Sequence, residues 1–215
     1  CFMEGLSCAR RGLGLFFFAW PLLAAADSGP AREGLRLWLD ASDAATLDVS
    51  SNAVTRWRDK SGAAHDARAV CAPALLARDF NGHPCVRLSG RDCFRLAPLA
   101  DKAGAVTVFV VSRRTPEQAG GAGWQRLGSV RSGTTADNTP PNLCLSTAAK
   151  SDAYAPSVKV MSKDAVAPGE VAIGAAAGSN SPQQAFRGDL AEVLVYDRGF
   201  LSEGALKEVL DYLSA

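Results

Sequence analysis

The sequence lacks an excess of charge of either sign. Its 23 Lys and Arg side chains nearly balance its 22 Asp and Glu side chains, and no run of like charge stands out. A protein that binds nucleic acid or an anionic membrane surface usually carries a basic patch or stripe. We therefore expect no nucleic acid among the partners of this chain.

The chain is also poor in histidine, a common ligand of transition metals and a common catalytic base. It has two histidines, His65 and His83, which are isolated in the sequence, and it has no C-x-x-C pair. A zinc site needs ligands at closer and more regular spacing. Two isolated histidines likewise give no basis for a Ser/His/Asp catalytic set.

Long apolar runs are missing except for one, which extends from Leu13 to Leu23. Arg10 and Arg11 precede it and three alanines follow it. This pattern predicts a secretory signal over residues 1–26, removed on export, followed by a linker over residues 27–33. The run is shorter than the ~20 residues of a membrane-spanning helix, which is the alternative interpretation. We expect a secreted or cell-surface protein whose mature chain does not insert into the membrane.

Four cysteines remain after such cleavage, and they allow either two disulfides or four buried thiols: Cys71, Cys85, Cys93 and Cys144. If Ser89-Gly90-Arg91 closes a hairpin, Cys85 and Cys93 are diagonal neighbours with Cα atoms ~7–8 Å apart. A disulfide seldom spans more than about 7 Å between Cα atoms. We predict that these two do not pair with each other, and that any bridges run to Cys71 and Cys144.

Short apolar runs separated by turn residues predict an all-β sandwich from residue 34 onward. Asn81-Gly82 is typical of a tight hairpin turn, so residues 80–96 are predicted to form a meander. The predicted strands are Leu35 to Asp40, Val54 to Arg58, Ala74 to Phe80, Cys85 to Leu88, Cys93 to Leu96, Val106 to Ser112, Gln125 to Val130, Leu143 to Ser146, Ser157 to Met161, Val171 to Ala175 and Leu190 to Tyr196.

One helix is predicted near the C-terminal end of the sequence. Ser202 can cap its N-terminus, and Glu203 lies where the helix dipole favours a negative charge. The helix carries an apolar stripe at i, i+3, i+4 and i+7, made of Leu206, Val209, Leu210 and Leu213. Such a stripe needs a partner surface.

Two stretches resemble the LamG-like jelly-roll branch of the concanavalin A-like lectin/glucanase superfamily. "LRLWLDASDAATLDVSSNAVTRWRDKSGAAHDA", residues 35–67, is similar to its first strand, its W-x-D-x-S-G turn and its following loop. "FRGDLAEVLVYDRGFLSEGALKEVLDYLSA", residues 186–215, is similar to its last strand and closing helix. The resemblance implies a two-sheet antiparallel jelly-roll sandwich over residues 34–215, with one C-terminal α-helix.

The same resemblance bears on Arg187-Gly188-Asp189, a tripeptide that serves in some adhesive proteins as a receptor ligand. In the family this position is a Gly-Asp lead-in to a strand. The apolar run that follows it here gives the tripeptide little freedom to project from a loop, so we expect no receptor-binding role.

Enzymes of the superfamily that cleave β-glucans use a Glu-x-Asp-x-x-Glu strand, and this spacing is missing. Asp189 and Glu192 are three residues apart and should point to opposite faces of a strand. Glu192 should share its face with Leu190, Leu194 and Tyr196, as a buried partner of an arginine such as Arg56 or Arg58. We therefore expect the protein not to be an enzyme.

Calcium and sugar ligands have candidate residues. Loop aspartates could offer oxygen ligands to calcium, although Asp in a turn usually caps its own backbone: Asp40, Asp43, Asp59 and Asp66. No other cofactor is expected. Trp124 and Tyr154 are the candidates for stacking on a sugar, whereas Trp38 and Trp57 fall inside strand patterns and are predicted to be core.

The function implied is an exported, non-enzymatic recognition module that binds carbohydrate or a cell-surface glycan, either alone or as part of a larger protein. One alternative is a structural module that binds a surface protein and no sugar. The other is a glycan-cleaving enzyme, which would need two carboxyl groups roughly 5 to 9.5 Å apart in a cleft.

Overall fold

A computed structural model describes residues 29–71, 73–114, 125–131, 143–147, 156–177, 185–199 and 201–214. The predicted signal segment and the two candidate stacking residues, Trp124 and Tyr154, lie outside these ranges. Within them, no helix combines the length and the apolarity that a membrane span requires.

β-strands dominate the described part of the chain, as the sequence predicts. The patterns in the sequence predict eleven of the strands and miss two, β2 and β4, which are only four residues long. The strands are β1 (Leu35–Asp40), β2 (Leu47–Ser50), β3 (Ala53–Trp57), β4 (Ala67–Val70), β5 (Ala74–Phe80), β6 (His83–Ser89), β7 (Cys93–Leu96), β8 (Gly104–Arg114), β9 (Gln125–Arg131), β10 (Leu143–Thr147), β11 (Ser157–Val166), β12 (Glu170–Ile173) and β13 (Arg187–Tyr196).

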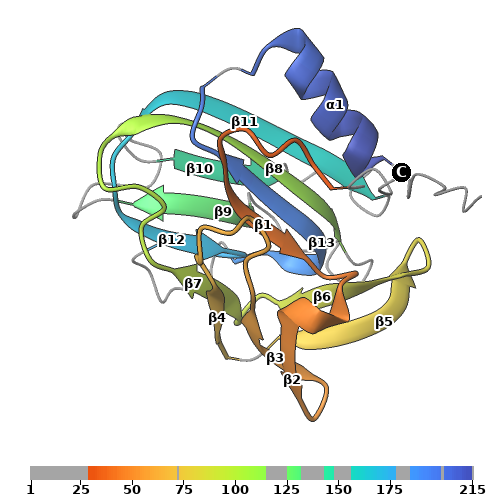
Figure 1. The fold of residues 1–215 in the computed structure, drawn as a ribbon. Coiled ribbons are helices and arrows are strands. Elements are labelled where there is room, and N and C mark those ends of the chain that lie inside the picture. Colours follow the sequence, from red (N-terminus) through yellow and green to blue (C-terminus); the bar gives the residue numbers. More distant parts are fainter. Residues whose placement is uncertain are drawn as a thin grey trace, which may run out of the picture.

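Hydrogen bonding joins these strands in the order β10-β9-β12-β7-β4-β3-β5-β6-β13-β8-β11, with β1 added to β13 and β2 added to β3 (Figure 1). Every ladder is antiparallel. A single residue pair, Ala53 with Ala74, joins β3 to β5, so the sheet divides there into two halves. The expectation of an antiparallel all-β fold is confirmed.

One apolar core lies between the two halves of the sheet. Trp57 and Phe94 contribute to it from one half, and Val110 and Val193 contribute from the other. The rings of Trp57 and Phe94 meet edge to face with their centroids 5.6 Å apart. Because every second residue of a strand points inward, this arrangement leaves the other face of each strand to the outside.

Helix α1 (Glu203–Leu213) covers the outer face of the half that contains β13, as Figure 1 shows. The Ser202 hydroxyl accepts a hydrogen bond from the Ala205 N–H, as expected of an N-cap. Val209 is fully buried in a second apolar cluster with Phe109 and Tyr196. The predicted helix and its packing stripe are confirmed.

The predicted meander over residues 80–96 is half right. The Asn81-Gly82 turn exists, with positive φ angles of 50° and 84°, and it pairs Phe80 with His83. The second predicted hairpin, at Ser89-Gly90-Arg91, is wrong. β6 pairs with β5 and β13, whereas β7 pairs with β4 and β12, so this segment carries the chain from one half of the sheet to the other.

The predicted end of β11 is also wrong. The sequence pattern ends this strand at Met161, but its pairing with β8 continues to Val166. Lys163 and Asp164 interrupt the apolar pattern. Since β11 is the last strand of the order, polar side chains there can face water without breaking the ladder.

Candidate functional site

A β-bulge in β13 decides which of its side chains reach the outer face. Leu190 pairs with Ser112 and Glu192 pairs with Val111, which leaves Ala191 as an extra residue. Leu190 therefore points into the core and Glu192 points outward. The prediction that Glu192 shares a face with Leu190 is wrong, because the bulge shifts the alternation by one residue.

The same bulge overturns the parity argument for Asp189 and Glu192. Asp189 is bound by Arg87 and Arg113 on the outer side of the sheet, which is also the side where Glu192 meets α1. The two carboxyl groups therefore lie on one face, not on opposite faces. They have different partners, however, and they do not form one site.

Glu192 links the sheet to the helix. The indole N–H of Trp38 and the hydroxyl of Tyr212 both donate to its Oε1 atom, each at 2.7 Å. Burial raises the pKa of Glu192 to about 7, although the hydrogen bond from Tyr212 opposes the shift. The predicted partners are wrong, because Arg56 pairs with Asp66 and Arg58 pairs with Asp48.

A second carboxyl group faces Glu192 across the β1–β13 ladder. Asp40 is the register partner of Glu192, and its Oδ2 lies 2.8 Å from Lys60 Nζ. Lys60 also lies 3.0 Å from Asp43 and sits over the ring of Trp38, 4.2 Å from its centroid. Burial alone would lower the pKa of Lys60, but its hydrogen bonds to the two aspartates outweigh burial and raise it.

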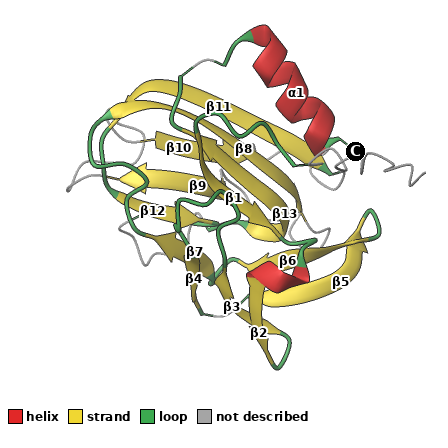
Figure 2. Cartoon of the chain, in the orientation of Figure 1, coloured by secondary structure: helices red, strands yellow, loops and turns green. Residues whose placement is uncertain are grey.

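An open cavity of about 910 Å³ lies over these groups. Its walls come from the C-terminal end of α1, from β1 and from the tip of the β5–β6 hairpin, which Figure 2 shows on the same side of the molecule. Aromatic and polar side chains share the lining: Trp38, Phe80, Tyr212, Arg32, Asp40, Lys60, Asn81, His83 and Glu192. We take this cavity as the candidate site and call it the β1–α1 cavity.

Asp59, in the W-x-D-x-S-G turn, holds the loop beside this cavity. Its Oδ1 accepts from the backbone N–H groups of Trp38 (2.9 Å) and Ser61 (2.8 Å), and its Oδ2 accepts from the Ser61 hydroxyl and the His65 N–H. The turn is thereby fastened to β1, so that Lys60 is placed against Trp38. The sequence motif identifies the turn but not this role.

The four aspartates considered for calcium all have other partners in the structure. Asp40 and Asp43 both contact the Lys60 ammonium group, which supplies the positive charge at that place. Asp59 binds backbone N–H groups, and Asp66 accepts from the Asp59 N–H (2.9 Å) and pairs with Arg56. A carboxylate that already pairs with a cation or accepts from backbone N–H groups is a poorer ligand for a further cation.

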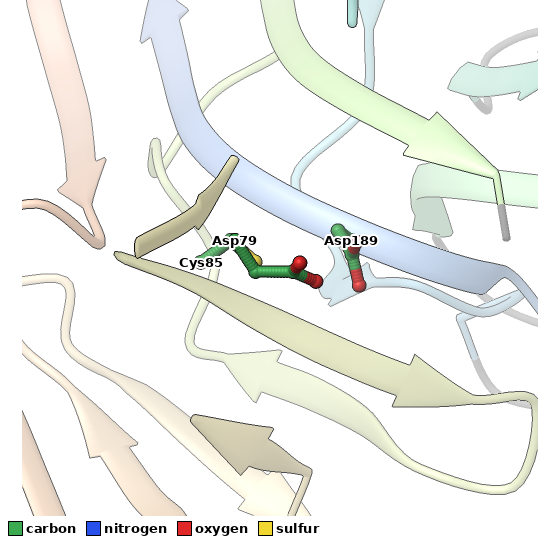
Figure 3. A group of neighbouring side chains, drawn as sticks. All are labelled: Asp79, Cys85 and Asp189. Carbon is green, nitrogen blue, oxygen red and sulfur yellow. The ribbon is translucent and has the colours of Figure 1, made fainter. Parts of the chain in front are cut away.

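Asp79, Cys85 and Asp189 form another group of close polar side chains, drawn in Figure 3. Arg87 and Arg113 each pair with both carboxylates, so two positive charges already balance two negative ones. Burial raises the pKa of Cys85 to about 12, which keeps the thiol protonated. This group is therefore better explained as a partly exposed ion-pair network around the buried Asp189 than as a metal centre.

The same network explains the Arg187-Gly188-Asp189 tripeptide. Asp189 has no exposed surface, and a Cβ atom at Gly188 would lie 2.2 Å from the Arg113 carbonyl oxygen. β13 begins at Arg187. The interpretation of this tripeptide as the start of a strand is confirmed.

The four cysteines are free and lie in different surroundings. Cys85 and Cys93 are buried, Cys144 is half-buried and Cys71 is exposed, so the alternative of four buried thiols is wrong for Cys71. The prediction that Cys85 and Cys93 do not pair with each other stays a prediction. Its premise, a hairpin between β6 and β7, is wrong.

No protein-family model and no curated protein sequence matches the chain. Among solved structures it is similar to domain 4 of AbnA, a GH43 extracellular arabinanase from Geobacillus stearothermophilus in complex with arabinotriose. The identity is 10%, the TM-score is 0.47, and the match covers 82% of this chain and 98% of that one.

It is also similar to an exo-beta-1,3-galactanase from Phanerochaete chrysosporium with beta-1,3-galactotriose, at 12% identity and a TM-score of 0.37. That match covers 69% of this chain and 30% of the galactanase chain, so this chain spans about a third of the galactanase. Both TM-scores lie below 0.5.

Proposed function

We propose that this chain is an exported, non-enzymatic recognition module of the LamG-like jelly-roll type that binds a glycan in the β1–α1 cavity. The observation that carries the proposal is the cavity itself. It has the volume of a small-molecule site, and its walls combine aromatic rings with hydrogen-bond donors and acceptors. Sugars present hydroxyl groups, which both donate and accept, beside apolar ring faces.

The charges in the cavity favour a glycan with little net charge. The positive charges of Arg32 and Lys60 are offset by the negative charges of Asp40 and Asp43, and the pKa of about 7 makes Glu192 partly neutral near physiological pH. Asn81 and His83, both exposed at the hairpin tip, add amide and imidazole groups. These groups are suited to hydroxyls rather than to a strongly anionic ligand.

The role of the indole ring of Trp38 is different from stacking on a sugar. Trp38 is only 5% exposed, and the side chains of Arg32 and Lys60 lie over its ring, 4.5 and 4.2 Å from the ring centroid. These cations occupy the surface on which a pyranose would stack. Contacts to a ligand therefore come from the polar rim and from the partly exposed Tyr212.

A glycan array with the purified mature chain, followed by titration calorimetry on each hit, tests the proposal. We expect His83→Ala to weaken binding about tenfold, because loss of one good hydrogen bond costs about 1.4 kcal/mol. Lys207→Ala, on an exposed part of α1 outside the cavity, is the matched control and should bind as the parent does. An array without hits would support a structural module instead.

One observation favours a second candidate function, glycan cleavage. Asp40 and Glu192 line the same cavity, and burial raises the pKa of Glu192 to about 7. An ionised carboxylate beside a carboxylic acid is the pair that glycoside hydrolysis uses. If an array hit is hydrolysed, and both Asp40→Asn and Glu192→Gln abolish hydrolysis while binding persists, the cavity is an active site and the non-enzymatic proposal is wrong.

A further inference from the structure

Two of the free cysteines lie at adjacent positions of neighbouring strands. β4 pairs with β7, and the last register pair of this ladder joins Val70 to Cys93. Cys71 is the next residue after Val70. Partner Cα atoms in an antiparallel ladder are about 5 Å apart and one residue advances the chain by about 3.3 Å, so the Cα atoms of Cys71 and Cys93 should be about 6 Å apart.

That spacing is within the range that a disulfide can span. The backbone at Cys71 supports the approach of the two side chains. Regular alternation would turn the Cys71 side chain away from the face that Val70 and Cys93 share. Cys71 has a φ of 59° instead, in the left-handed region that a non-glycine residue seldom adopts, and this breaks the alternation at the end of β4.

Cys71 is also among the groups whose charge acts on the pKa of Cys93. Burial raises the pKa of Cys93, and the charge of an ionised Cys71 acts on it in the same direction. Cys93 itself is only 6% exposed, packed beside Ala175 and Ala185, whereas Cys71 is open to solvent.

Neither of the other two cysteines is placed to compete. Cys144 is separated from β7 by three strand spacings, or about 14 Å, because the register pairs it with Ser129, Ser129 with Ala172, and Ala172 with Arg95 of β7. Cys85 lies on β6 in the other half of the sheet, packed with Phe80 and Val111. Within the described residues, Cys71 and Cys93 are the pair that the register brings together.

We propose that Cys71 and Cys93 form an intramolecular disulfide when the chain meets a disulfide oxidant such as oxidised glutathione. The Cys71 thiolate attacks the glutathione disulfide and expels one glutathione thiolate. Cys93 then loses its proton and attacks the Cys71 sulfur of the mixed disulfide, which expels the second. Two cysteine sulfurs are oxidised, one glutathione disulfide is reduced by two electrons, and the two thiol protons pass to the released glutathiones.

The cross-link closes a loop that contains the whole β5–β6 hairpin. On its β3 side, this hairpin is joined to the rest of the sheet by the single Ala53–Ala74 pair. Closing a loop of roughly 20 residues lowers the entropy of the unfolded chain. The disulfide would therefore stabilise the segment that carries Phe80, Asn81 and His83 to the wall of the β1–α1 cavity, whether or not that cavity binds a glycan.

Tryptic peptide mapping of the full chain tests this directly, because cleavage after Lys and Arg puts each of the four cysteines on its own peptide. These peptides are residues 69–78, 79–87, 92–95 and 132–150. After incubation with oxidised glutathione and alkylation without reduction, we expect 69–78 linked to 92–95 as the main cross-linked species. Cys71→Ser should remove it, and Cys144→Ser, the matched control, should leave it unchanged.

The thermal midpoint provides a second measurement. Reduction should lower the Tm of the oxidised parent by about 6–12 °C and leave that of Cys71→Ser unchanged. A main cross-link between 92–95 and either 79–87 or 132–150 would overturn the proposal. So would complete alkylation of both Cys71 and Cys93 after exposure to the oxidant.

Discussion

Replacing Glu192 by Gln should make the stability of the protein depend less on pH. The pKa of Glu192 is raised from its usual 4.5 to about 7, with burial as the largest cause. Between these two values the folded chain holds a proton that the unfolded chain has released. This raised pKa therefore adds stability in full below pH 4.5, and that stability is lost as the pH rises through 7.

The size of the effect follows from the same two values. A shift of about 2.5 pH units at about 1.4 kcal/mol per unit gives roughly 3 kcal/mol. Gln keeps an oxygen that can accept from Trp38 and Tyr212, so the variant loses the titration but retains the hydrogen-bonding geometry. Relative to Glu192→Gln, the parent should lose up to about 3 kcal/mol of unfolding free energy between pH 4 and pH 8.

Urea unfolding of parent and variant at five pH values gives this difference, and the other carboxyl groups cancel when the two curves are subtracted. Glu203→Gln, at the exposed first turn of α1, is the matched control and should give a nearly flat difference. The reasoning is refuted if the difference between parent and Glu192→Gln is constant over this range. A difference that grows in the opposite direction would refute it equally.

Two further substitutions test the packing around the site. Gly188→Ala should lower the free energy of unfolding by about 1–3 kcal/mol, because its Cβ would lie 2.2 Å from a carbonyl oxygen of β8. Gly204 lies in open space, so Gly204→Ala is the control and should not destabilise the protein. Equal urea midpoints for the two variants would contradict this prediction. Asp59→Ala should cost about 3 kcal/mol, because it removes the acceptor of three part-buried backbone N–H groups, those of Trp38, Ser61 and His65. The same measurement checks it, and an unchanged midpoint would show that the turn holds without Asp59.

Much of the architecture is local enough to be predicted from the sequence. The run from Leu190 to Tyr196 is rich in residues that favour strands and is bounded by turn residues, which indicates a strand. Asn81-Gly82 can adopt the positive φ angles that its turn requires, and Ser202 has the hydroxyl that a helix N-terminus needs. In each case the signal and the structure it specifies lie within a few residues of each other.

The candidate site could not be predicted in this way, because its geometry depends on pairings across the chain. A glycine would have hinted at the bulge in β13, but the extra residue is Ala191, and nothing in the sequence marks it. Glu192 meets Asp40 only through the register of β1 with β13. Tyr212 falls outside the apolar stripe of its helix, so no pattern in the sequence predicts its contact with Glu192.

The prediction of a hairpin between β6 and β7 was wrong for a related reason. Ser89-Gly90-Arg91 has the composition of a hairpin turn, and composition cannot tell a turn between neighbouring strands from a passage between the two halves of the sheet. In the structure, the carboxylate of Asp92 stabilises the turn: it accepts from the Ser89 N–H at 3.0 Å and from the Ser89 hydroxyl. These bonds hold the turn without any ladder between β6 and β7.

Glu192 serves the fold and the candidate site at once, and this affects how binding should be measured. Its carboxyl group joins β1 through Trp38 to α1 through Tyr212, so any change there alters two walls of the β1–α1 cavity. A loss of binding in Glu192→Gln would therefore not distinguish a lost ligand contact from a displaced wall. His83 is exposed at the hairpin tip and holds no wall in place, so its replacement isolates the ligand contact. Binding is best tested at His83, and the attachment of the helix is best tested at Glu192.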